Sequence, residues 1–204
     1  MKKTLLALSL LISIAVFSQE NTAYISKLNN HRAEANKEFG DTATSILPDK
    51  MVLEEFKHLN YFEPNPKFNV TAKFKKELGK EFNMTTSSGK LKKYRQYGIL
   101  SFDIDGKNYK LPIYQSIRLM KMEKYKDHVF IPFTDLTNDE ETYGGGRYIE
   151  ANLPTEDTFN LDFNYCFNPY CHYTTGYNCP IPPKENFLDL RIEAGEKKFK
   201  DDEH

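Results

Sequence analysis

The sequence of 204 residues lacks most of the features that reveal an activity. It contains no Gly-x-Ser-x-Gly elbow, no His-Glu-x-x-His helix and no dinucleotide-binding glycine fingerprint. No catalytic residue or cofactor is therefore expected from motifs alone. The formal net charge is only -1, so nothing in the composition predicts a nucleic-acid partner. No internal repeat is visible, and nothing specifies an oligomeric state.

Long apolar runs are also missing after the first residues, so we expect no membrane span. The N-terminus itself is distinctive. Lys2 and Lys3 precede an apolar stretch, Leu5 to Val16, that is too short to cross a bilayer, and small or aliphatic residues follow at 16–18. This pattern predicts a signal peptide over residues 1–18 and export of the mature chain to the periplasm or the extracellular space.

The remaining sequence changes its hydrophobic period once. Apolar residues from Tyr24 to Phe39 repeat at helical spacing, and Gly40 is a natural stop. A second, short helix is predicted from Pro48 to His58. We therefore expect residues 19–60 to form a helical segment that packs on the core.

Beyond residue 60 the apolar residues alternate, as they do in strands. A hairpin is predicted at Asp105-Gly106, between Leu100 to Ile104 and Tyr109 to Ile113. Further strands are expected over 129–133, 147–151, 159–165 and 188–193. A single change from helices to strands argues against a doubly wound parallel sheet. The predicted fold is mainly β with N-terminal helices (α+β), an antiparallel sandwich or small barrel, with a β core over 61–196 and a frayed tail over 197–204.

One predicted strand carries polar residues at alternate positions. In the segment 159–165, Asp162 and Asn164 lie on the face opposite Leu161 and Phe163. The plain interpretation is that this face meets water. The sharper hypothesis is that Asp162 and Asn164 meet Arg147 and Tyr148 in a shared polar pocket.

A run of three glycines precedes Arg147. The backbone N–H groups of Gly144 to Gly146 could hold a phosphate, but a strand rather than a helix is predicted after them. The alternative is a tight turn that needs positive φ angles. Arg147 could bind a carboxylate or phosphate through its planar guanidinium.

Three cysteines lie within fourteen residues. In an exported protein Cys171 and Cys179 are the favoured disulfide pair, which leaves Cys166 as a free thiol or a competing partner. A zinc site would combine the three cysteines with His172, but the adjacency of Cys171 and His172 fits it poorly. We therefore expect no metal.

Taken together, these segments resemble a known family. The order Thr142-Tyr143-Gly144-x-Gly146-Arg147-Tyr148, Leu161-Asp162-Phe163-Asn164, Asn168-Pro169-x-Cys171, Cys179-Pro180-x-Pro182-Pro183-x-Glu185-Asn186 and Ala194-Gly195-Glu196 is similar to the bacterial and archaeal domain of unknown function 1684. The resemblance runs from about Arg32 to Glu196. It implies no established reaction. The sequence departs from the family pattern at Cys166 and Tyr170.

The positions that match the family motifs supply the candidate site. The ligand-binding candidates are Tyr143, Gly144, Gly146, Arg147, Tyr148, Asp162, Asn164, Asn168 and Asn186.

Two functions are compatible with these residues. The first is a binding or structural module whose polar pocket holds a small polar or anionic ligand. The alternative is a hydrolase that uses Asp135, Glu141 or Asp162 as an acid or base beside Arg147. On the binding hypothesis, Arg147→Ala abolishes ligand binding with little loss of melting temperature, whereas a large loss of stability indicates a structural role.

Overall fold

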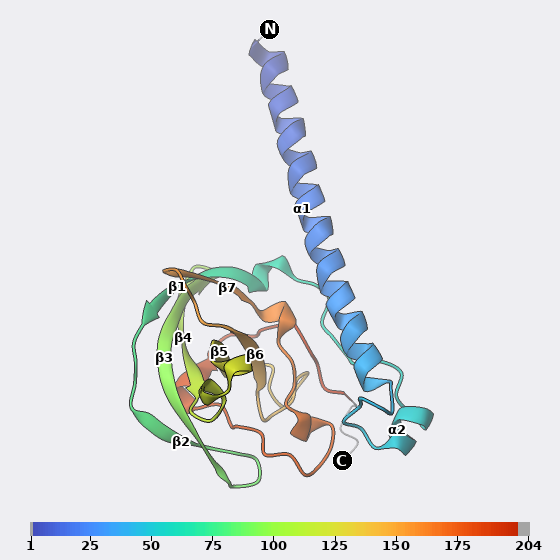
Figure 1. The fold of residues 1–204 in the computed structure, drawn as a ribbon. Coiled ribbons are helices and arrows are strands. Elements are labelled where there is room, and N and C mark those ends of the chain that lie inside the picture. The colour runs from blue at the N-terminus through green and yellow to red at the C-terminus, as the bar shows by residue number, and fades with distance from the viewer. Residues whose placement is uncertain (1, 200–204) are drawn as a thin grey trace.

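The computed structural model describes the backbone of residues 2–199 and the side chains of residues 21–199. The helices come first. Helix α1 (Lys2–Phe39) ends at Gly40, whose N–H donates to the Asn36 carbonyl, and the short α2 (Asp49–Glu54) follows. In Figure 1 both helices lie at one side of a curved sheet. Buried Leu28 and partly buried Ala35 and Phe39 form the contact face of α1, as the helical spacing predicts.

The strands form a single half-barrel sheet that is antiparallel apart from one short pair. Its order is β6-β5-β4-β3-β1-β7, with β2 paired to β3 and the two-residue β8 parallel to β5. The strands are β1 (Asn69–Lys76), β2 (Glu81–Thr85), β3 (Leu91–Ile104), β4 (Lys107–Ser116), β5 (His128–Asp135), β6 (Arg147–Asn152), β7 (Thr158–Asp162) and β8 (Phe187–Leu188). The α+β class is confirmed, and the sheet curves into a half-barrel instead of pairing with a second sheet.

A β-bulge in β3 changes which face of the sheet the even-numbered side chains of this strand occupy. The register between β3 and β4 shifts between Gln96 and Gly98. Before the bulge Tyr94 packs on one face, and after it Leu100 packs on the other, although both positions are even-numbered. Gly98 is required here because a Cβ atom would lie 2.4 Å from the Phe74 ring.

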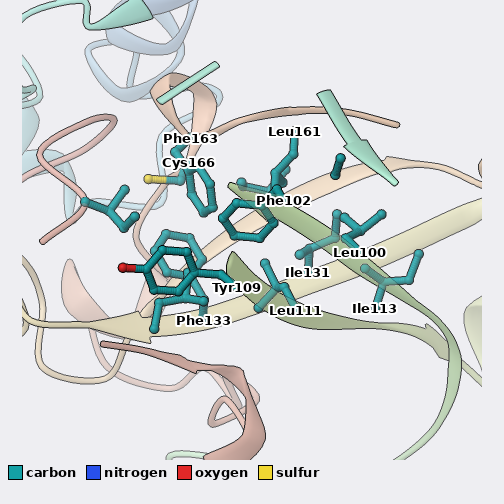
Figure 2. Packing of buried hydrophobic residues seen from close by; sticks show 14 of the residues in the cluster. Leu100, Phe102, Tyr109, Leu111, Ile113, Ile131, Phe133, Leu161, Phe163 and Cys166 are labelled. Carbon is teal, nitrogen blue, oxygen red and sulfur yellow. The ribbon is translucent and has the colours of Figure 1, made fainter. Parts of the chain in front are cut away.

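The main core fills the concave face. Figure 2 shows apolar side chains from β3, β4, β5 and β7 converging there, with Phe163 and Cys166 beside them. A smaller aromatic cluster occupies the opposite face, built from Met84, Tyr94, Tyr114, Phe130 and Tyr148. Alternation within β5 accounts for the division, since Ile131 belongs to the main core and Phe130 to the aromatic cluster.

Several predicted elements are confirmed and others need correction. The β3–β4 hairpin turns at Asp105 and Gly106, both at positive φ, as the Asp-Gly pair predicts. The strand expected over 159–165 ends at Asp162, where the Asp162 side chain accepts the Asn164 N–H and starts a 3₁₀ turn over Phe163–Tyr165. The strand expected over 188–193 is reduced to β8.

The two ends of the chain carry further predictions. The predicted signal peptide lies outside the residues whose side chains are described, and residues 200–204 of the predicted tail lie outside the described chain. Lys197 is not frayed, because its N–H donates to the Asn60 carbonyl, and Asn60 Nδ2 donates to the carbonyls of Lys198 and Phe199. Within the described residues, no helix combines the length and apolar character needed to cross a membrane.

Candidate functional site

Arg147 lies at the centre of a buried polar cluster, which we call the arginine cluster (Asp135, Thr137, Thr142 and Arg147). Its guanidinium has no exposed surface, and Nη2 lies 3.1 Å from Asp135 Oδ1 in an ion pair whose side chains are both fully buried. The Thr137 hydroxyl is within hydrogen-bond distance of both partners. Arg147 therefore has a carboxylate partner of its own and no surface for a ligand.

The arginine cluster also holds the C-terminal segment of the chain. Arg147 donates to the carbonyl oxygens of Ile192 and Glu196, at 2.8 and 3.2 Å, and to that of Ala194. The second Asp135 oxygen accepts the Ile192 N–H at 2.7 Å. These bonds satisfy backbone groups in a segment that belongs to no strand, so the cluster takes the place of a sheet ladder.

The glycine run before Arg147 is a tight turn. Gly146 has a φ of +87°, and a Cβ atom there would lie 2.6 Å from the Phe133 carbonyl oxygen. A Cβ atom on Gly144 would overlap the Asp139 carboxylate. A strand, β6, follows the turn. The glycines are needed for close backbone approach. The Tyr143 ring beside them packs at a tilt against His172, with 4.7 Å between the ring centroids.

Asp162 and Asn164 do not meet Arg147. The Tyr24 hydroxyl of α1 donates to both Asp162 oxygens, at 2.9 and 3.1 Å. Asn164 exchanges two hydrogen bonds with the backbone of Asn65, at 2.8 and 2.9 Å. The expected shared pocket is therefore not formed, and these residues attach α1 and the segment before β1 to the core.

The two remaining asparagine candidates are also buried and used internally. Asn186 donates to the carbonyls of Pro112 and Pro132 and accepts the Tyr114 hydroxyl at 2.8 Å. Asn168 donates from its side chain to the Lys197 carbonyl at 2.8 Å. Both residues join segments that are distant in sequence.

A second buried carboxylate lies next to the arginine cluster. Glu196 accepts the Asn168 backbone N–H at 2.7 Å and the Tyr173 hydroxyl at 2.5 Å. Burial raises the pKa of Glu196 to about 7, although these donors and Tyr61 oppose the rise. Cys166, the free cysteine, is also buried, and burial raises its pKa to about 12. Sequence reasoning missed Glu196 as a perturbed group, because its burial depends on contacts with segments far away in the chain.

The three carboxylates of the hydrolase hypothesis are dispersed. Asp135 is paired with Arg147, Asp162 accepts the Tyr24 hydroxyl, and Glu141 pairs with Arg191 at 2.5 Å. Among the residues that the structure describes, none of the five main hollows has two of them in its wall. The geometry thus gives no acid–base pair beside Arg147.

A groove lies on the face of the sheet that carries the aromatic cluster. It consists of two adjoining hollows that share Lys92, Tyr148, Glu150 and Pro180 in their walls. The first, of about 510 Å³, we call the cationic lobe; its floor is Tyr94 and Phe130, and its charged wall includes Lys92, Lys93, Arg118, Lys121, His128 and Glu150. The second, of about 440 Å³, we call the tyrosine lobe; Tyr148, Phe167, Tyr170 and Tyr177 line it. Volumes of this size suit small ligands.

Tyr148 alone among the predicted candidates lines the groove. Strand alternation explains the separation, since Arg147 and Tyr148 are neighbours in β6 and point to opposite faces of the sheet. The Tyr148 ring packs edge-on against Phe130 at 4.7 Å, and its hydroxyl donates to the Pro180 carbonyl. The groove side chain is thus fixed in position.

The charges around the cationic lobe are unbalanced. Four lysine and arginine side chains line it against one carboxylate, Glu150, which lies 3.5 Å from His128 Nε2. One of the four, Lys93, lies 4.0 Å from Glu81 Oε2, which leaves Lys92, Arg118 and Lys121 as the excess. Lys92 donates to the Asn178 carbonyl at 2.6 Å. Burial, and then the charge of Arg118, lower the pKa of Lys92. An anion placed here would relieve this repulsion.

The disulfide predicted from the cysteine spacing lies at the edge of the groove. Cys171 and Cys179 are bonded, with their Cα atoms 6.2 Å apart, so the pair favoured over the zinc alternative is confirmed. The closed loop is attached to the β2–β3 turn, because the Ser87 N–H donates to the Cys179 carbonyl at 2.9 Å and Cys179 N–H donates to Ser87 Oγ at 3.2 Å. In the described part of the chain no group of three metal-ligating residues is placed to hold a metal ion.

These features define an α+β protein in which buried polar clusters join the helical and C-terminal segments to an antiparallel half-barrel. Residues 54–197 match the family model described as a protein of unknown function, DUF1684, and the chain belongs to this family. A similar solved structure is the solution NMR structure of an uncharacterized protein from gene locus rrnAC0354 of Haloarcula marismortui. It shares 29% identity with a TM-score of 0.66, over 91% of this chain and 99% of that one. No curated protein matches the chain.

Proposed function

We propose that this DUF1684 protein is a binding module for a small anionic ligand, and that the groove is its site. The observation that carries the proposal is the excess of positive charge around an aromatic floor. Lys92 and Arg118 line the same hollow as Phe130 and Tyr94, and the pKa of Lys92 is lowered in part by Arg118. Two cations held close together over aromatic rings favour an anion with an apolar part.

The candidates around Arg147 have a different part in this proposal. The arginine cluster, Asp162 and Asn164, and the two asparagines all bond to other segments of the chain. They connect the sheet to the C-terminal segment and to α1. The structural and the binding hypotheses are thus assigned to separate regions of one protein.

The test uses a fluorescent aromatic sulfonate, 8-anilinonaphthalene-1-sulfonate, titrated into the purified protein. We expect Lys92→Gln to weaken binding by roughly five- to tenfold, since it removes a charge that contributes on the order of 1 kcal/mol at a partly exposed site. Lys110→Gln is the matched control, because Lys110 is an exposed lysine of β4 outside the groove. Equal affinity of both variants and the wild type would refute the groove as an anion site.

We also propose that the protein acts outside the cytoplasm. The lysine pair and apolar stretch at the N-terminus support cleavage after residue 18, and the Cys171–Cys179 disulfide suits an oxidising compartment. Mass spectrometry of the protein isolated from the native host tests this: export predicts a chain that begins at Gln19, whereas a chain that retains residues 1–18 contradicts it.

A further inference from the structure

The two lobes of the groove differ in chemistry. The cationic lobe has Arg118, Lys121 and Lys93 in its wall, and the tyrosine lobe has none of them. Lys92 and Glu150 line both lobes, so charges of opposite sign meet at the junction and the excess of positive charge lies in the cationic lobe. A ligand that fills the groove would therefore meet charge at one end and rings at the other.

Two exposed tyrosines, Tyr170 and Tyr177, line the tyrosine lobe. Tyr170 and Tyr177 are 41% and 39% exposed, which is high for large side chains that line a hollow. Their rings pack edge to face at 5.1 Å. Exposed rings held in a fixed pair offer a surface on which a flat ligand ring can stack.

The wall that carries these tyrosines is held in place. Tyr177 lies inside the loop closed by the Cys171–Cys179 disulfide, and Tyr170 is the residue directly before Cys171. Lys92 Nζ donates to the carbonyl of Asn178, the residue after Tyr177, at 2.6 Å. A preformed wall loses little freedom when a ligand binds.

We propose that the ligand is an elongated molecule, with an anionic group in the cationic lobe and an aromatic or sugar ring against Tyr170 and Tyr177 in the tyrosine lobe. The inference rests on the proposed function and adds the ring and its place. Aromatic and sugar rings both stack on tyrosine, and they are the two sources of such a ligand.

Isothermal titration calorimetry with three probes tests this inference. Phenyl phosphate carries an aromatic ring, glucose 6-phosphate a sugar ring, and inorganic phosphate no ring. We expect at least one of the ring-bearing phosphates to bind the wild type roughly five- to tenfold more tightly than inorganic phosphate. Which of the two does so identifies the ring.

Two variants assign the outcome. In Tyr177→Ala the advantage of the ring should disappear while affinity for inorganic phosphate stays unchanged, and Tyr177→Phe should retain the advantage because it keeps the ring. An unchanged ring advantage in Tyr177→Ala, or none in the wild type, would overturn the inference. Lys92→Gln should weaken all three probes, and if it weakens none, the proposed function fails instead.

Discussion

Two arginines show how differently the regions of this protein use the same side chain. Arg147 is completely buried, pairs with Asp135 and donates to carbonyls of the C-terminal segment. Arg118 is exposed and lines the groove beside Lys92, whose pKa is lowered by burial and then by the charge of Arg118. A buried arginine with its own carboxylate is committed to the fold, because removing it leaves the other charge buried and unpaired, whereas an exposed arginine without a carboxylate at ion-pair distance can attract a ligand.

A motif rich in glycine, arginine and tyrosine can therefore define an architecture without lining a binding site. Of the family-like segment at 142–148, only Tyr148 lines the groove. The basic side chains of the groove lie outside this motif and look in the sequence like ordinary surface residues: Lys92, Lys93, Arg118, Lys121 and His128.

The largest effect is expected for Arg147→Ala. It leaves the Asp135 carboxylate buried without its cation and the carbonyls of Ile192 and Glu196 without their donor. Breaking a buried pair in this way costs about 3 to 5 kcal/mol. Urea denaturation measures it, with Arg118→Ala as the matched control. Wild-type stability in Arg147→Ala would remove the contrast between the two arginines.

The second prediction concerns pH and Glu196. The folded-state pKa of about 7 lies above the ordinary value of 4.5, so the folded protein binds this proton more strongly than the unfolded chain does. Binding of this proton therefore stabilises the folded protein fully below pH 4.5, and that stabilisation is lost as the pH rises through about 7. The difference corresponds to about 3 kcal/mol.

Denaturation at a series of pH values tests the role of Glu196. The isosteric variant Glu196→Gln keeps an oxygen that can accept from Asn168 and Tyr173 and cannot ionise. We expect its free energy of unfolding to fall less than that of the wild type between pH 5 and pH 8. Parallel profiles for the two proteins would show that Glu196 titrates normally.

The third prediction concerns the disulfide. Replacing both Cys171 and Cys179 with serine opens a loop of eight-residue separation, and we expect a loss of about 2 to 3 kcal/mol. The tyrosine lobe should lose its ring preference as well, because its wall is released. Iodoacetamide provides the control: in the native wild type, buried Cys166 should stay unmodified, and unfolding without reduction should expose one thiol. Modification of two or more thiols in that unfolded, unreduced sample would contradict the pairing.

The smallest effect on stability is expected in the groove. Arg118→Ala and Lys121→Ala remove exposed side chains that have no carboxylate at ion-pair distance among the described residues, and such changes alter stability by no more than about 0.5 kcal/mol. Ligand affinity and its dependence on salt should fall instead. Thermal melting and the sulfonate titration together measure both quantities, and a large drop in melting temperature would place these residues in the fold.

Local sequence rules predicted the elements that depend on neighbours along the chain. Asp105-Gly106 forms the hairpin turn because both residues adopt positive φ, and Gly40 ends α1. The Cys171–Cys179 pair follows from a short separation that a loop can close. The strand predicted over 159–165 is confirmed only as far as Asp162, because the Asp162 side chain caps a turn that ends it.

The candidate site was harder to predict because it depends on faces and partners. The shared-pocket hypothesis places Arg147 and Tyr148 on one side, whereas strand alternation in β6 places these adjacent residues on opposite sides of the sheet. In β5, Phe130 belongs to the aromatic cluster and Ile131 to the main core. Apolar residues at consecutive positions of this strand indicate that both faces of the sheet are covered. No local rule indicates that Arg118 and Lys92 share a hollow.

Spacing, local backbone preference and motif order along the chain are enough to predict the α+β class, the central hairpin, the glycine turn, the disulfide pairing and membership of the DUF1684 family. Tertiary structure decided that Asp135 is the partner of Arg147, that Glu196 is buried, and that the bulge at Gly98 turns Tyr94 towards the groove. The physical reason is that burial and charge pairing are properties of side chains brought together from distant segments, and the same residue types become a core or a surface according to which face of the sheet they occupy.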